Sequence, residues 1–237
     1  RGLGEGRFGT AIVLPAGRSA YAIDTGDLDE DGFPDVVIPN EHDDRATYCL
    51  NPGRGCFSAV TKETARRWSV RVLPATPISG KRSHAVNDAR IADLNGDGHL
   101  DVVTANLGTS TISIFAGRGD GTFEETTATA GVEDTGAGMS VSWEDYDNDG
   151  DLDLYVGNMF SAAGQRVTGK EDYKAGDRQL QGIYRRHARG NSLFRNSGGG
   201  AFEDRSLAGS SWFGRWAWGS DFLDFNLDGH EDIYVQN

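Results

Sequence analysis

Four nine-residue segments of the chain repeat one pattern of oxygen-bearing side chains, Asp-x-Asp/Asn-x-Asp-Gly-x-x-Asp, at residues 27–35, 93–101, 145–153 and 224–232. Side chains at alternate positions place several oxygens on one side of a tight loop. The glycine at position 6 lets the backbone turn sharply and point the position-7 carbonyl inward. Hard oxygen ligands in this number suit Ca²⁺ better than Mg²⁺, which keeps more water. The sequence therefore predicts up to four calcium sites.

The predicted ligands occupy equivalent positions in each segment, with side-chain oxygens at positions 1, 3, 5 and 9 and a backbone oxygen at position 7. The predicted side-chain ligands are Asp27, Asp29, Asp31, Asp35, Asp93, Asn95, Asp97, Asp101, Asp145, Asp147, Asp149, Asp153, Asp224, Asn226, Asp228 and Asp232. The predicted backbone ligands are Phe33, His99, Asp151 and His230.

An EF-hand begins in the same way, but it requires a glutamate at position 12 and a helix after the loop. Position 12 is instead Ile38, Thr104, Val156 or Val235. Each of these residues lies in a run rich in β-branched and aromatic side chains, which is typical of a buried strand. The loops are therefore expected to join two strands.

A second repeated element, Gly-x-Phe, falls at residues 6–8, 55–57, 121–123 and 200–202 and is typical of a hairpin turn that leads into a strand. Each repeat then contains a strand, an acidic loop, a strand, a longer connection, a strand, a glycine turn and a strand. Four antiparallel strands at this period are typical of a propeller blade. We thus predict an all-β propeller of about four visible blades in one domain, residues 1–237.

The predicted units and insertions follow from the spacing of these motifs. The units cover residues 19–59, 86–127, 138–205 and 216–237, with 1–18 as the end of a split unit, and the insertions are 60–85 and 161–190. The two ends either close a ring or belong to a larger propeller. Arg1 stands where an initiator methionine would, so we expect the sequence to be part of a longer protein.

The third segment with its following strand, residues 145–158, resembles the FG-GAP/VCBS repeat of integrin-α-type β-propellers. Residues 138–143, 158–164, 193–196 and 214–219 are similar to bacterial secreted relatives of cartilage acidic protein. This resemblance implies a calcium-binding propeller. It also implies a ring of seven blades, of which this chain would supply about half.

The net charge is −13, from 36 acidic and 23 basic residues, which argues against nucleic-acid binding by the whole surface. The two insertions are exceptions, because residues 60–85 carry a net charge of +5 and residues 161–190 of +4. We predict that both insertions lie at the end of the blades opposite the acidic loops. The predicted partner-binding residues are Arg66, Arg67, Trp68, Arg71, Tyr173, Arg178, Tyr184, Arg185 and Arg186. The alternative is that the insertions only neutralise the acidic scaffold.

Two cysteines, Cys49 and Cys56, flank the turn-forming residues 51–55. A disulfide across this hairpin is geometrically reasonable and would indicate an oxidising compartment, while two unpaired core thiols are the alternative. The sequence contains no apolar run long enough for a membrane span.

These observations favour an extracellular or periplasmic calcium-binding scaffold whose partner is a protein or a glycan, anionic ones included. One alternative is a structural subunit of a larger envelope complex. Another is a polysaccharide lyase or hydrolase, for which Tyr173, Tyr184 and His187 are the candidate acid and base residues. No Ser-His-Asp set or phosphate-binding loop is visible, so the sequence predicts no catalytic residue.

Overall fold

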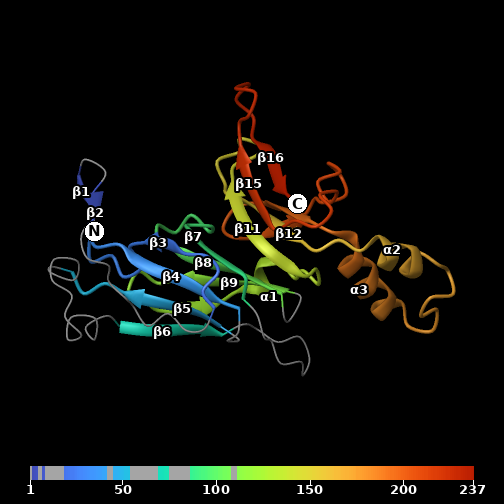
Figure 1. Ribbon diagram of the computed structural model, residues 1–237, viewed down its shortest axis with the longest axis horizontal. Coiled ribbons are helices and arrows are strands. Elements are labelled where there is room, and N and C mark those ends of the chain that lie inside the picture. The colour runs from blue at the N-terminus through green and yellow to red at the C-terminus, as the bar shows by residue number, and fades with distance from the viewer. Residues whose placement is uncertain are drawn as a thin grey trace.

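The computed structural model describes residues 2–4, 7–8, 19–41, 45–53, 69–74, 86–107 and 111–237, and most of its regular elements are strands (Figure 1). The first four-stranded sheet contains β3 (Asp24–Gly26), β4 (Asp35–Asn40), β5 (Arg45–Leu50) and β6 (Ser69–Pro74). The second contains β7 (Asp88–Ala92), β8 (Asp101–Asn106), β9 (Thr111–Gly117) and β10 (Phe123–Glu125). The third contains β11 (Gly138–Glu144), β12 (Asp153–Asn158), β13 (Ser192–Asn196) and β14 (Phe202–Asp204). In each sheet, antiparallel strands follow one another in chain order, as predicted for blades.

Two further pairs of strands form separate sheets. β1 (Gly2–Gly4) pairs with β2 (Arg7–Phe8), and β15 (Gly219–Leu223) pairs with β16 (Asp232–Gln236). The sequence predicts these pairs as the two ends of one split unit. In the described residues they do not share a sheet, and Figure 1 shows them apart. The described part of the chain therefore forms an open series of sheets and no closed ring.

Successive sheets pack face to face through apolar layers. The second strands β4, β8 and β12 are buried along their whole length, which explains their nearly continuous apolar sequence. Adjacent side chains of β8 enter different layers: Val102 packs with the first sheet, and Val103 packs with the third. The first strands β3, β7, β11 and β15 contact one another in that order. The second and third sheets are thus packed against a neighbour on both faces.

The insertion after β12 forms two helices, α2 (Ala162–Thr168) and α3 (Arg178–Arg189), and a short helix α1 (Thr127–Ala130) follows β10. Ser161 caps α2 by accepting a hydrogen bond from the backbone N–H of Gly164, and Asp177 caps α3 in the same way through Leu180. Figure 1 shows α2 and α3 extending beyond the sheets. The insertion lies at the predicted end, because it joins the second and third strands.

The first unit departs from the prediction. Its fourth strand is β6, which does not begin at Phe57 but lies within the predicted insertion 60–85 and pairs with β5. The placement of the whole first insertion at the opposite end is therefore wrong. The motif at 55–57 lies outside the described residues.

The predicted disulfide is not formed in the structure. Cys49 is a buried free thiol, and Cys56 lies outside the described residues. The prediction assumed a tight hairpin, but the residue opposite Cys49 in the fourth strand is Val70. Burial raises the pKa of the Cys49 thiol, and the nearby charge of Asp35 raises it further.

Within the described residues, no helix is both long enough and apolar enough to cross a membrane.

Candidate metal centres

The four acidic loops share one internal hydrogen-bond network. In every loop the position-1 aspartate accepts hydrogen bonds from the backbone N–H groups of positions 5 and 6, at 2.9 to 3.2 Å. The position-5 aspartate accepts from the N–H of position 7 at 2.8 to 3.0 Å. Because four separate segments adopt the same bonds, the repeat pattern specifies a defined loop conformation.

Two positions in each loop have left-handed backbone. The position-6 glycines have φ between 85° and 95°, as the turn requires, and a Cβ atom on them would meet nothing within 4 Å. Glycine is therefore needed there for its φ angle and not for space. Position 4 is also left-handed, although its residues differ: they are Glu30, Gly96, Asn148 and Leu227. The sequence analysis missed this second turn, because no shared residue type marks it.

The position-9 aspartates of the first three loops are almost fully buried, with Asp35, Asp101 and Asp153 at most 1% exposed. One oxygen of each accepts from the N–H of loop position 2, at 2.8 to 3.2 Å. The other accepts from a backbone N–H at the end of the third strand, at 2.6 to 2.8 Å. Each carboxylate thus joins the acidic loop to the third strand of its own sheet. Desolvation by burial raises the pKa of each to about 6, against the lowering effect of these hydrogen bonds.

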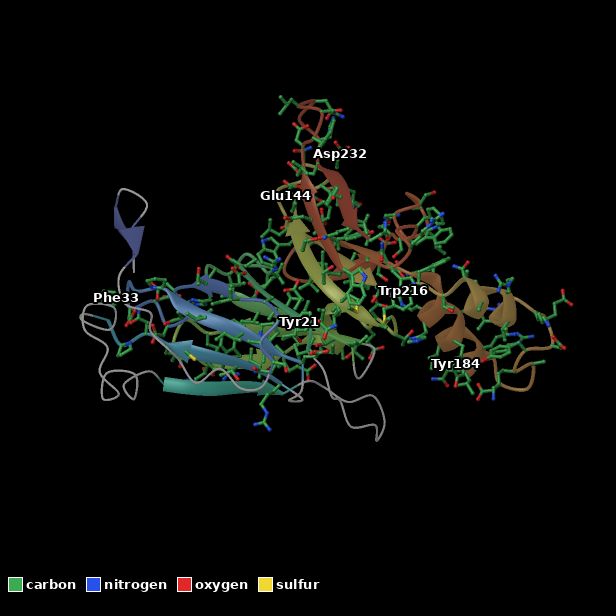
Figure 2. All side chains as sticks on the ribbon, viewed as in Figure 1. Tyr21, Phe33, Glu144, Tyr184, Trp216 and Asp232 are labelled. Atoms are coloured by element: carbon green, nitrogen blue, oxygen red, sulfur yellow. The ribbon has the colours of Figure 1, made fainter. Side chains whose placement is uncertain are left out.

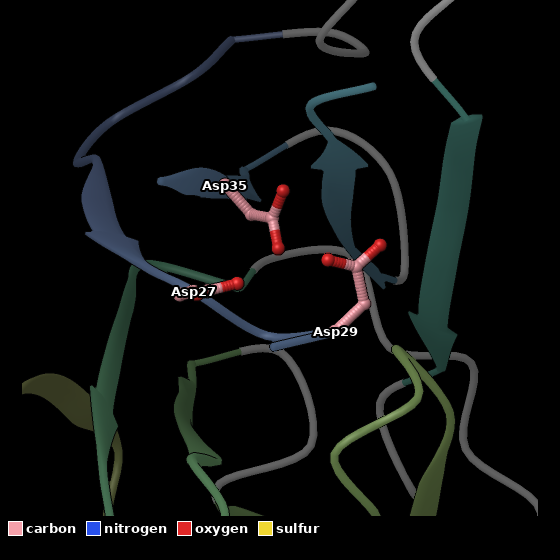
Figure 3. Close-up of side chains that lie close together, drawn as sticks. All are labelled: Asp27, Asp29 and Asp35. Atoms are coloured by element: carbon pink, nitrogen blue, oxygen red, sulfur yellow. The ribbon is translucent and has the colours of Figure 1, made fainter. Parts of the chain in front are cut away.

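The first loop fits a bound cation. One oxygen from each of Asp27, Asp29 and Asp35 lies within 4.8 Å of the others, and Figure 3 shows the three carboxylates turned toward a common space. Asp29 Oδ1 is buried and has no hydrogen-bond partner in the part of the chain that the structure describes. Burial, followed by the charge of Asp31, raises the pKa of Asp29. An oxygen-only donor set with an unsatisfied buried carboxylate oxygen is the kind of site that suits a hard cation such as Ca²⁺.

The third loop also gathers carboxylate oxygens, from Asp145, Asp147 and Asp149, within 4.8 Å of one another. Here a protein side chain already supplies positive charge. Arg195 of β13 donates from Nε to Asp147 and from Nη2 to Asp149 Oδ2, the latter at 2.6 Å. A metal bound by both carboxylates would require the Arg195 guanidinium to move away.

The second and fourth loops have an asparagine at position 3, and the structure brings no such set of three carboxylates together in either of them. Their position-7 histidines each contact the preceding acidic loop in the chain. His99 forms an ion pair with Glu30, and His230 Nδ1 lies 3.3 Å from Asn148 Nδ2. The hydrogen bond to Glu30 raises the pKa of His99. Position 4 of one loop therefore meets position 7 of the next, a contact that the sequence analysis did not predict. Coordination by the position-7 carbonyls stays a prediction.

The predicted partner surface is divided by the structure. Arg66, Arg67 and Trp68 lie outside the described residues. Arg71 donates from Nη1 to the Gly121 carbonyl at 2.7 Å, beside the acidic loops and away from the helical insertion. Its assignment to a common face with the insertion is therefore wrong.

The remaining predicted residues lie on the insertion formed by α2 and α3. Tyr173 and Tyr184 pack edge to face with ring centroids 5.9 Å apart, and Tyr184 is labelled in Figure 2. Arg178 and Arg185 are exposed, whereas Arg186 turns inward to Asp134 and Asp204. For Arg186, the alternative prediction that the insertion neutralises the acidic scaffold is thus correct. His187 Nδ1 lies 2.9 Å from the Thr135 carbonyl.

The fold and loops define a class of protein: all-β repeats of four antiparallel strands whose first two strands are joined by an acidic loop. A model of the FG-GAP-like repeat matches residues 93–156 and 176–235, more than half of the chain. The chain therefore belongs to the FG-GAP-like repeat family, as the sequence resemblance predicted.

Among solved structures, the chain is similar to an Agrocybe aegerita lectin described as specifically recognising non-reducing terminal N-acetylglucosamine. The two are 18% identical with a TM-score of 0.41, over 91% of this chain and 46% of the lectin chain. The chain thus spans about half the length of that lectin. None of the curated proteins compared with the chain matches it.

We expect Asp101→Ala to destabilise the protein by about 2 to 5 kcal/mol, because Leu94 N and Gly117 N lose their acceptor inside the protein. Asp232→Ala is the matched control: Asp232 has the same repeat position but lies exposed on the two-stranded sheet (Figure 2). Urea unfolding in excess chelator measures both. Equal losses for the two variants would contradict the bridging role.

The metal-free protein should become more stable as the pH falls from 7 to 5. The pKa values of Asp35, Asp101 and Asp153 are about 6 when folded and near 3.8 when unfolded. Between these values the folded state binds more protons, so stability declines as the pH rises. Urea midpoints at several pH values in chelator test this, and Asp101→Asn should flatten the slope. A slope of opposite sign, or one unaffected by Asp101→Asn, would refute the assignment.

Proposed function

We propose that this chain is a calcium-stabilised segment of a β-propeller that acts as a binding scaffold for a protein or glycan, in an extracellular or periplasmic compartment. Calcium binding is supported by the oxygen cluster of Asp27, Asp29 and Asp35 and by the unpartnered Asp29 Oδ1. When bound, Ca²⁺ would supply the positive charge that these carboxylates lack. Oxygen-ligand calcium sites of extracellular modules are typically weak and fill where calcium is plentiful, which supports the proposed compartment.

The scaffold proposal is supported by the helical insertion. The second unit joins its second and third strands by the four residues 107–110, whereas the third unit uses more than thirty residues for the same connection. Such a difference is not needed to complete a blade. The extra chain forms two capped helices that extend beyond the sheets, with Arg178, Tyr184 and Arg185 exposed. Loops carried on a rigid scaffold are common sites of recognition.

Chelation should lower the melting temperature, and Ca²⁺ at about 100 times its dissociation constant should raise it by roughly 5 to 10 °C per site. Asp29→Asn should remove one site from the stoichiometry in calorimetric titration. Glu125→Gln is the matched control, because it removes the same charge from an exposed strand position outside the loops. An unchanged melting temperature in chelator would exclude a stabilising role for calcium.

Replacing residues 159–189 with the second unit's Leu-Gly-Thr-Ser connection should abolish partner binding while keeping the calcium-dependent rise in melting temperature. The aligned strand ends make the exchange feasible, since Asn106 pairs with Thr111 and Val156 pairs with Ser192. Arrays of acidic glycans, neutral glycans and secreted proteins provide the measurement. Binding that survives the replacement would place the partner surface elsewhere, and no binding by the parent chain would contradict the scaffold proposal.

A further inference from the structure

One face of α3 combines three arginines with a glycine. Gly182, Arg185, Arg186 and Arg189 are spaced at i, i+3, i+4 and i+7, so they form a single stripe along the helix. This stripe lines a hollow of about 490 Å³ against α2, with Gln165 on the opposite side and Leu207 at its edge. The sequence analysis noted the positive charge of this segment but not that three arginines converge.

Gly182 is unfavourable within a helix compared with alanine, because glycine loses more backbone freedom on folding. Close packing does not explain its presence, since a Cβ atom at this position would meet nothing within 4 Å. It lies opposite α2 on the stripe that lines the hollow. Its effect is therefore to leave the hollow open where another residue would fill it.

The acidic side chains at the hollow do not satisfy the arginines. Arg186 donates from Nε to Asp134 Oδ1 at 3.1 Å and also pairs with Asp204, while Arg189 lies 3.5 Å from the same Asp204. Among the described residues, Arg185 donates only from Nε, to the Thr168 carbonyl at 2.9 Å. Three guanidinium groups thus face two carboxylates, which leaves an excess of one positive charge.

Two guanidinium nitrogens, Arg186 Nη2 and Arg189 Nε, are buried without a hydrogen-bond partner among the described residues. Unsatisfied donors on charged groups are costly, so the arginines are not explained by the stability of the helix pair alone. The Arg186 guanidinium also lies over the Phe194 ring, 5.6 Å from its centroid. These contacts hold the arginines in place before any ligand arrives, which reduces the entropy lost on binding.

We propose that this hollow binds the carboxylate or sulfate group of a ligand about the size of an acidic monosaccharide. Guanidinium groups match both oxyanions through paired hydrogen bonds. The volume lies within the range of small-ligand sites, roughly 300 to 1,000 Å³. The C-terminal ends of α2 and α3 carry partial negative charge, which disfavours a bound anion. At the end of α2, however, Arg185 already donates a hydrogen bond to the Thr168 carbonyl. The inference rests on the proposed function, because it specifies the ligand of the same insertion.

Calorimetric titration of the whole chain with glucuronate, galactose 6-sulfate and neutral galactose tests the proposal. We expect saturable, salt-sensitive binding of at least one anionic sugar and none of galactose. Gly182→Leu, which fills the hollow, and Arg185→Gln should each weaken binding about ten- to a hundredfold. Arg166→Gln is the matched control, because it removes the same charge from an exposed position of the neighbouring helix α2 outside the hollow and should leave binding unchanged. Melting temperatures check that each variant is folded.

Several outcomes would overturn the inference: no saturable binding of either anionic sugar, equal binding of galactose, equal loss in Arg166→Gln, or equal affinity for a short acidic peptide. These outcomes can be distinguished from outcomes that contradict the scaffold proposal. If the residue 159–189 replacement abolishes partner binding while Gly182→Leu does not, the insertion binds through another surface. If the replacement has no effect, the scaffold proposal itself fails.

Discussion

The buried position-9 carboxylate is the interaction on which each sheet depends. Through Asp35, Asp101 or Asp153, it ties the acidic loop to the third strand of the same sheet by two backbone hydrogen bonds. The loop therefore belongs to a four-stranded unit and not only to the hairpin that contains it. In the two-stranded sheet of β15 and β16 there is no third strand, and Asp232 is exposed.

This interaction explains why positive charge gathers around the loops. Burying a carboxylate among other carboxylates is unfavourable, as the raised pKa values of these aspartates show. The protein supplies part of the compensation itself. Arg195 bridges two carboxylates in the third loop, and His99 pairs with Glu30 between the first two loops. In the first loop Asp29 Oδ1 has no partner, so that loop has the greatest need of an external cation.

The sequence predicted the repeated unit because its main features are local. The loop positions, the glycine turns and the buried strands each follow from residue types at fixed spacing. Features that depend on long insertions were not predictable in this way. The fourth strand of the first unit, β6, lacks the Gly-x-Phe signal and was missed, and the proposed Cys49–Cys56 pairing was wrong for the same reason. The convergence of Arg185, Arg186 and Arg189 became visible only with the helix in place.

The third unit carries arginines at both ends. Arg195 lies at the acidic loop, where it neutralises the carboxylates of its own unit. Arg186 and Arg189 lie at the opposite end, beside Arg185. There the carboxylates of Asp134 and Asp204 balance only part of the positive charge of the three arginines. The arginine at the acidic-loop end is therefore matched by carboxylates, whereas the arginines at the opposite end outnumber the carboxylates beside them. An excess of positive charge that is held in position and borders an open hollow is better suited to binding an anion than to stabilising the fold.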